Sequence, residues 1–209
     1  KAADKGHVGA MFFYGLLCYQ EKNYIEAKSY LLRASNQGHV VASTLYAKMI
    51  LKKVCDVTDI TAAADLLETA ASKKYPPAMT LLAHLLKENG KKQKAQALID
   101  EAATLGSPGA IYSLATKAIG DDNELENGAK FAAKAAKKNH RGAKKLLGVM
   151  KRRGVGTQKD INEAFSLLEQ AADRGDEQAQ FHLAKMYLRG DGCQVNEQKA
   201  FQLVSQSAD

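Results

Sequence analysis

The pattern of apolar and small residues repeats six times along the chain. In each repeat, an alanine is followed four residues later by a large apolar or aromatic residue and five residues later by a second small residue. This spacing places all three positions on one face of a helix, which we call helix A. The first alanines are Ala10, Ala42, Ala78, Ala110, Ala143 and Ala179, at intervals of 32, 36, 32, 33 and 36 residues. A period of this length predicts a helical solenoid.

A second pattern predicts another helix, helix B, later in each repeat. A small residue is followed three positions later by an apolar residue, and seven and eight positions later by a pair of small residues. The small residues that begin this pattern are Ala27, Ala63, Ala95, Gly128, Ala164 and Ala200. The turns after helix B contain Gly38, Lys74, Gly106, Asn139 and Gly175. Glycine and asparagine are typical of helix ends that close in a left-handed conformation.

The connection from helix A to helix B is longer in some repeats and is rich in glycine in the last two. These connections read Arg-Gly-Val-Gly at 153–156 and Arg-Gly-Asp-Gly at 189–192. A glycine-rich loop can bind phosphate, but no strand is predicted before these loops and no GxxxxGK[ST] pattern is present. We therefore interpret the glycines as turn residues at a helix end.

These residues resemble a known family. The stretch from Gly148 through Gly154-Val155-Gly156 to Ala171-Ala172-Asp173-Arg174-Gly175 resembles the Sel-one-like repeat (SLR), a relative of the tetratricopeptide repeat, and 179–209 is similar to it. The resemblance implies an all-α fold, a right-handed α/α superhelix of about six helix-turn-helix units. It further implies a non-catalytic scaffold that binds other proteins, with no catalytic residues to transfer.

The repeat boundaries predict the domain organisation. We expect one SLR solenoid over 1–209, with repeats at 7–38, 39–74, 75–106, 107–139, 140–175 and 176–209. Residues 1–6 are similar to the repeat ending at 171–175, so we interpret them as the tail of a preceding repeat. We therefore expect the chain to be a fragment of a longer array.

The composition excludes little beyond a membrane span. The chain has 209 residues, 45% of them hydrophobic, and no apolar run approaches the roughly 18 residues that a spanning helix needs. Its cysteines are Cys18, Cys55 and Cys193, which form no CxxC motif. Cys18 and Cys55 fall in neighbouring repeats and could meet, so their oxidation state stays open.

The net charge of +7 is concentrated in one block. Residues 127–159 contain no acid and eleven cations, which are Lys130, Lys134, Lys137, Lys138, Arg141, Lys144, Lys145, Lys151, Arg152, Arg153 and Lys159. One interpretation is a solvated basic surface, which fits the members on helix B. The other is a binding site for a polyanion.

The similarity to tetratricopeptide arrays indicates which cations face a partner. In such arrays, a concave groove is lined by the helix A positions that do not pack, here two, three, six, nine and ten residues after the first alanine. These positions contain eight cations and one acid. The candidate partner-binding residues are Lys48, Lys52, Lys87, Tyr112, Lys145, Arg152, Arg153, Phe181, Lys185 and Arg189. A groove of this composition predicts binding of an acidic or carboxylate-ended segment of a partner protein.

The sequence contains no catalytic or metal-binding pattern. His7, His39 and His140 recur at the same repeat junction, which indicates a structural role, and His84 and His182 lie three repeats apart and cannot share a metal. No HExxH, paired cysteine or GxSxG motif is present. The acids Asp121, Asp122, Glu124 and Glu126 fall in a helix connection, where turn and N-cap residues are expected. We expect no enzyme activity, no cofactor and no metal.

Two other functions stay open. Nucleic acid could bind the basic block 130–159, although no RNP, KH or base-reading repeat is present. The resemblance to long bacterial SLR proteins suggests an accessory of the cell envelope or of virulence that docks a peptidoglycan-acting enzyme. By that resemblance alone, a periplasmic or secreted location is favoured. We expect a monomer.

Overall fold

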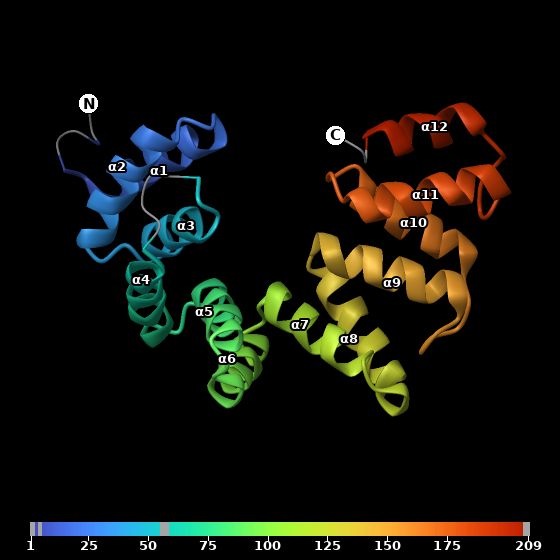
Figure 1. The fold of residues 1–209 in the computed structure, drawn as a ribbon, viewed down its shortest axis with the longest axis horizontal. Coiled ribbons are helices and arrows are strands. Elements are labelled where there is room, and N and C mark those ends of the chain that lie inside the picture. Colours follow the sequence, from blue (N-terminus) through green and yellow to red (C-terminus); the bar gives the residue numbers. More distant parts are fainter. Residues whose placement is uncertain (1–2, 4–5, 55–58, 207–209) are drawn as a thin grey trace. The chain divides into compact units, whose positions relative to one another are not determined.

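The computed structural model describes residue 3 and residues 6–54 and 59–206. Within these ranges the chain forms α-helices, one short 3-10 helix (η1) and no strand. The expected all-α repeat fold is therefore confirmed. The chain divides into two compact units, Lys1–Ser107 and Pro108–Asp209, which are described separately (Figure 1).

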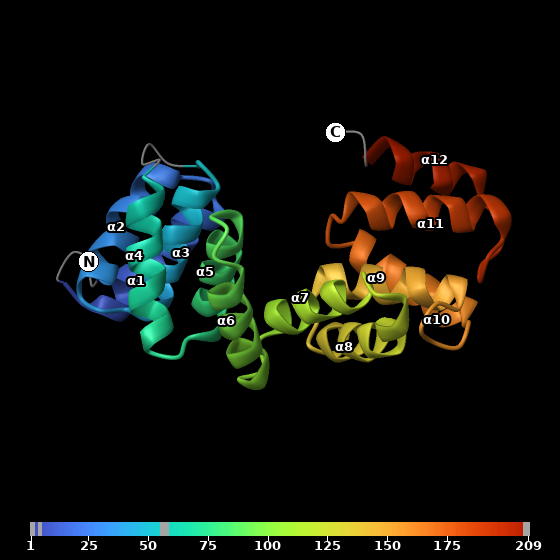
Figure 2. The same cartoon turned by 60° about the horizontal axis from the view of Figure 1, so that its bottom comes forward.

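Each unit contains three consecutive helix pairs. The first unit contains α1 (Val8–Gln20), α2 (Tyr24–Asn36), α3 (Val40–Leu51), α4 (Ile60–Ser72), α5 (Pro76–Glu88) and α6 (Lys92–Thr104). The second contains α7 (Pro108–Ala118), η1 (Asp122–Glu124), α8 (Leu125–Lys137), α9 (Arg141–Arg153), α10 (Ile161–Ala172), α11 (Glu177–Arg189) and α12 (Glu197–Gln206). Odd-numbered helices are helix A and even-numbered ones helix B. Within a unit, each helix B packs on its own helix A and on the next one (Figure 2).

The small residues lie where the helices approach one another most closely. Ala42, Ala78, Ala110, Ala143 and Ala179 are completely buried. A Cβ atom on Gly148 would lie 2.9 Å from Cγ of Leu168 in helix B, and one on Gly15 would lie 2.9 Å from Cγ of Leu31. Because real Cβ contacts are longer, a larger side chain would push the two helices apart. The small residues of helix A therefore allow helix B to pack closely against it.

The most buried residue of helix B lies one position beyond the apolar residue of the sequence pattern. The sequence singled out the apolar residue three positions after the first small residue, for example Leu66 and Leu167, but these side chains are only half-buried. The next residue is the buried one, as Leu67 and Leu168 show with no exposed surface. Tyr14 is also 42% exposed, although its register predicts a packed position.

The turns have the predicted left-handed conformation. Gly38, Gly106 and Gly175 have φ angles of +79°, +84° and +71°. Lys74 and Asn139 adopt the same conformation, with φ angles of +54° and +67°. Each of these residues ends a helix B and turns the chain into the next helix A.

The glycine-rich connections contain turn glycines, as expected. Gly154 and Gly190 are the left-handed C-caps of α9 and α11, each with a φ of +73°. Gly156 (φ +65°) packs on the start of α8, where an added Cβ would overlap the Leu125 carbonyl. Gly192 (φ +73°) packs on the start of α10, where an added Cβ would lie 2.9 Å from the Ile161 oxygen. Each connection therefore lies against the helix B of the preceding repeat.

Long basic side chains join successive turns. Arg141 Nη1 donates to the carbonyls of Arg174 (2.9 Å) and Gly175 (3.2 Å). Arg174 Nη1 donates back to the carbonyl of Asn139 at 2.7 Å. In the first unit, Lys73 Nζ donates to the carbonyl of Gly38 at 3.2 Å. The accepting carbonyls belong to the turns that follow helix B.

Some predictions concern residues that the structure does not describe. In the predicted tail 1–6, residues 1, 2, 4 and 5 lie outside the described residues, as do residues 207–209. Cys55, the candidate partner of Cys18, also lies outside them. Cys18 is a buried free thiol and Cys193 a partly buried one.

Candidate functional site

The recurring histidines cap helices. Nδ1 of His7, His39 and His140 accepts a hydrogen bond from the backbone N–H three residues later, at 3.2, 3.1 and 3.2 Å. Asp176 accepts in the same way from Ala179 N–H at 3.0 Å. The structural role predicted for the histidines is confirmed.

Aromatic residues of the preceding helix A pack on two of these caps. The rings of Phe12 and His39 are stacked with centroids 4.6 Å apart, and the rings of Tyr112 and His140 are separated by the same distance. Tyr112 is half-buried, and its pKa is raised by burial and by Asp176. Tyr112 therefore supports the junction, a role that its place among the candidate binding residues did not anticipate.

We expect the second unit to lose stability at acidic pH through His140. Burial, and then the charge of Arg141, lower the pKa of His140 below its usual value. The unfolded chain therefore binds this proton more readily, and stability falls as pH drops through about 6.5. The His140→Asn variant keeps a cap acceptor and loses the titration. Its melting temperature should change less between about pH 7.5 and about pH 5.5 than that of the unmodified chain; equal changes would contradict this assignment.

The candidate binding residues fall in both compact units. Lys48, Lys52 and Lys87 belong to the first unit, on α3, just after it, and on α5. Lys48 is half-buried, and its pKa is lowered by burial and by Lys52. The other seven candidates belong to the second unit. The site described below is therefore built on the second unit alone.

In the second unit, two neighbouring helices contain a cluster of cations. Helices α9 and α11 lie side by side (Figure 1, Figure 2). We call their candidate cations the basic face, which comprises Lys145, Arg152 and Arg153 on α9 and Lys185 and Arg189 on α11. Arg153 and Arg189 are exposed and the other three are partly buried.

Few protein groups neutralise the basic face. Lys145 Nζ lies 3.6 Å from Asp176 Oδ1 and donates to Gln178 Oε1 at 2.6 Å. Lys185 Nζ lies 4.2 Å from the ring centroid of Phe181, a cation–π contact. Among the described residues, Lys145 is the one member of the basic face with an ion pair.

Two nitrogen atoms at this face are buried without a hydrogen-bond partner. They are Nη1 of Arg152 and Nδ1 of His182. The pKa of His182 is lowered, first by burial and then by Arg152, Arg153, Lys185 and Lys145 in that order. His182 lies three residues after Ala179, at one of the helix A positions expected to line the groove, although it was not among the candidate partner-binding residues.

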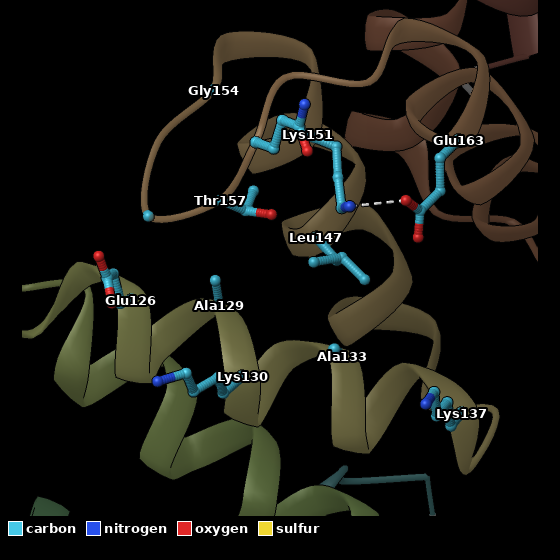
Figure 3. Close-up of a pocket in the computed structure, with 12 residues that line it drawn as sticks. Glu126, Ala129, Lys130, Ala133, Lys137, Leu147, Lys151, Gly154, Thr157 and Glu163 are labelled. Atoms are coloured by element: carbon cyan, nitrogen blue, oxygen red, sulfur yellow. Dashed lines mark ion pairs between the residues drawn. The ribbon is translucent and has the colours of Figure 1, made fainter.

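The basic block also contributes to a separate pocket. This pocket of about 700 Å³ is lined by α8, α9, the connection after α9 and the start of α10 (Figure 3). Ala129 and Ala133 on α8 and Leu147 on α9 form its apolar part (Figure 3).

Acidic side chains offset much of the positive charge of this pocket. Lys130, Lys137 and Lys151 line it together with Glu126 and Glu163. Lys151 Nζ lies 2.7 Å from Glu163 Oε2 (Figure 3). Because two carboxylates face three ammonium groups, the pocket suits a polyanion less well than the basic face does.

Lys144 corrects the interpretation of the block as a solvated surface. Its side chain is buried, with 8% of the residue surface exposed. Its Nζ donates to Asn139 Oδ1 and to Gln170 Oε1. Burial and Arg174 lower its pKa. The helix B lysines Lys130, Lys134, Lys137 and Lys138 are exposed, as expected.

The remaining polar groups have structural roles. Asp121 caps η1 by accepting from Asn123 N–H at 3.0 Å, as predicted for a turn residue. Across residues 6–54 and 59–206, no three His, Cys, Asp or Glu side chains converge as metal ligands. None of the helices within those ranges has the length and apolar character required to cross a membrane.

Comparison with known proteins identifies the repeat. The family model described as Sel1 repeat matches residues 7–39, 143–176 and 177–209. These ranges correspond to the helix pairs α1 with α2, α9 with α10 and α11 with α12. No curated protein matches the chain.

Solved structures share the fold at low sequence identity. A protective antigen of uropathogenic Escherichia coli with an SLR fold is 24% identical, with a TM-score of 0.65 over 99% of this chain and 46% of the antigen. A Sel1 repeat protein of Oxalobacter formigenes is 21% identical, with a TM-score of 0.73 over 94% and 83%. An immunity protein of Pseudomonas aeruginosa is 20% identical, with a TM-score of 0.72 over 93% and 81%. The present chain thus spans less than half of the E. coli antigen.

These similarities agree with the arrangement of the helices. The family model matches helix-turn-helix pairs of this chain, and the solved structures share its fold. Such folds commonly serve as scaffolds for protein–protein interaction. The chain therefore contains three Sel1 repeats within an all-α fold of helix-turn-helix pairs.

Proposed function

We propose that this chain is a non-catalytic scaffold whose basic face binds an acidic segment of a partner protein. The observation that supports this most is the set of cations on α9 and α11, of which one has an ion pair among the described residues. Lys151, by contrast, has a carboxylate partner in Glu163. Here the partner carboxylates would come from another molecule.

The chemistry of these side chains suits such a segment. Arginine offers a planar fork that can bind both oxygens of a carboxylate, and lysine adds a mobile charge. A surface of one charge also attracts an oppositely charged segment and raises the association rate. Lys48, Lys52 and Lys87 would extend this preference to the first unit.

The proposal predicts selective binding of acidic peptide. The probe is acetylated and amidated hexaglutamate, with hexaglutamine as the matched uncharged control. We expect calorimetry at about 20 mM salt to give a Kd of about 10 to 100 µM for hexaglutamate, weakening as salt screens the charges. Hexaglutamine should not bind. Equal binding of both peptides, or of neither, would contradict the proposal.

Nucleic acid is the competing polyanion. A single-stranded oligonucleotide of about 20 nucleotides, titrated in the same assay at low and at higher salt, tests this alternative. Binding of nucleic acid should weaken steeply as the salt concentration rises. If the oligonucleotide binds more tightly than hexaglutamate, the basic block is better explained as a nucleic-acid site. No binding at low salt would exclude that function.

The type of partner is a second question. A protective antigen and an immunity protein are among the structures with this fold, which favours a role in a bacterial envelope or in virulence as a secondary proposal. In that role, the partner could be a peptidoglycan-acting enzyme. The mechanism, an acidic segment on the basic face, would be the same.

A further inference from the structure

Arg152 and His182 are an unusual pair for a folded protein. Nη1 of Arg152 and Nδ1 of His182 are both buried and have no hydrogen-bond partner among the described residues. Buried polar atoms are nearly always paired, so each unpaired one requires an explanation. The two residues belong to neighbouring helices, α9 and α11, at groove positions of consecutive repeats.

The charges around His182 are all positive. On α9 they are Lys145, Arg152 and Arg153, and on α11 Lys185. No carboxylate is among the groups that act on this imidazole. Asp176, which forms the ion pair of the basic face, lies against Lys145 at 3.6 Å. An anion placed between the two helices would therefore meet unpaired donors and no competing acid.

We propose that Arg152 and His182 together bind one carboxylate of the partner, with a guanidinium N–H and the imidazole Nδ1–H donating to its two oxygens. This inference rests on the proposed function and names the point of recognition within the basic face. The surrounding side chains must move aside, because both atoms are covered in the free chain. Long lysine and arginine chains make such movements readily.

The pair makes binding depend on pH. In the free chain, burial and four cations keep the pKa of His182 below its usual value. A bound carboxylate opposes both effects, so the pKa of His182 rises in the complex. Between the two pKa values the complex holds a proton that the free chain lacks. Binding therefore takes up protons, and affinity increases as pH falls through this window.

The experiment measures proton uptake with hexaglutamate as the probe. Calorimetry at about pH 6.5 in buffers of different ionisation enthalpy gives the number of protons bound per complex. We expect uptake of a measurable fraction of one proton, and an affinity about tenfold higher at about pH 6 than at about pH 8. The peptide carboxylates titrate near pH 4 and contribute little in this range.

Two variants separate this inference from a general charge effect. His182→Gln retains a neutral donor and cannot titrate, so it should bind with the same affinity at about pH 6 and about pH 8. Arg152→Lys keeps the charge and loses the fork, and we expect a loss of about tenfold at both values. His84→Gln, in the other unit, is the matched control and should keep the pH dependence.

The outcomes distinguish the two proposals. If hexaglutamate binds without proton uptake, and His182→Gln behaves like the unmodified chain, the pair does not recognise the carboxylate and the proposed function still holds. If hexaglutamate does not bind at any pH, both proposals are wrong. A pH dependence that persists in His182→Gln also overturns the role of this residue.

Discussion

Replacing Gly156 by alanine is expected to lower the free energy of unfolding of the second unit by about 3 kcal/mol. Gly156 has a φ of +65°, which alanine adopts only with strain. The added Cβ would overlap the Leu125 carbonyl and lie 2.6 Å from its carbon. These are backbone atoms at the start of α8, which cannot move as a side chain can. The connection after α9 must therefore separate from α8.

Gly175→Ala is the matched control for this variant. Gly175 has a similar φ of +71°, and no atom would lie within 4 Å of an added Cβ. Its replacement should cost only the conformational strain, about 1 kcal/mol. Urea unfolding followed by circular dichroism measures both variants, and amide exchange in α8 locates the loss. If both variants lose equal stability, the contact with Leu125 contributes nothing beyond the backbone conformation.

Reversing three charges of the basic face is expected to abolish binding of acidic peptide. In the variant Lys145→Glu, Arg152→Glu and Arg189→Glu, each reversal replaces an attraction by a repulsion. At about 1 kcal/mol for each position, the total is about 3 kcal/mol, or a loss of about a hundredfold in affinity. Calorimetry with hexaglutamate measures it. Affinity within about threefold of the unmodified chain would show that the basic face is not the site.

The control variant carries the same change of net charge on another surface. Lys130, Lys134 and Lys137 are exposed on α8, and replacing all three by glutamate should change affinity little at about 150 mM salt, where charges are screened beyond about 8 Å. An equal loss in both variants would indicate a response to net charge alone.

Lys145 is bonded to Asp176 and Gln178, and Arg152 is partly buried, so circular dichroism must show that the triple variant stays folded. A milder variant avoids this difficulty by using Arg153→Glu, Lys185→Glu and Arg189→Glu. These three side chains have no ion pair among the described residues. We expect the same direction of change in affinity.

The sequence predicted the features that depend on local chemistry. Left-handed turns at Gly38, Asn139 and Gly175 follow from which residues tolerate a positive φ. The structural role of His140 follows from its recurrence at the repeat junction, and the small residue Gly148 follows the strict spacing of the helix A pattern. Each of these features involves residues close in sequence or a strict repeat of spacing.

Features that depend on side-chain direction between helices could not be predicted in this way. Lys144 belongs to a run of cations, yet its helix places it against Gln170 in the next helix B. The cations of α9 that surround His182 could be recognised only from the structure, in which α9 and α11 lie side by side. Gly156 is predicted to be a turn residue, but nothing in the sequence indicates that it packs against the backbone of Leu125. In all three cases the partner lies on another helix.

The bonds between successive turns have a consequence for cooperativity. Arg141 and Arg174 connect the turn at Asn139 to the turn at Gly175, so residues that begin and end one repeat are held by the same two side chains. In a linear array, the stability of each repeat depends on coupling to its neighbours. Arg174 bonds to Asn139 at the end of the preceding repeat, and Arg141 Nε lies 3.9 Å from Asp176 Oδ2 in the following one, so the pair couples the α9–α10 repeat to both neighbours. The repeat that supplies three of the five cations of the basic face therefore opens together with its neighbours, and the spacing of those cations is preserved for as long as that part of the array is folded.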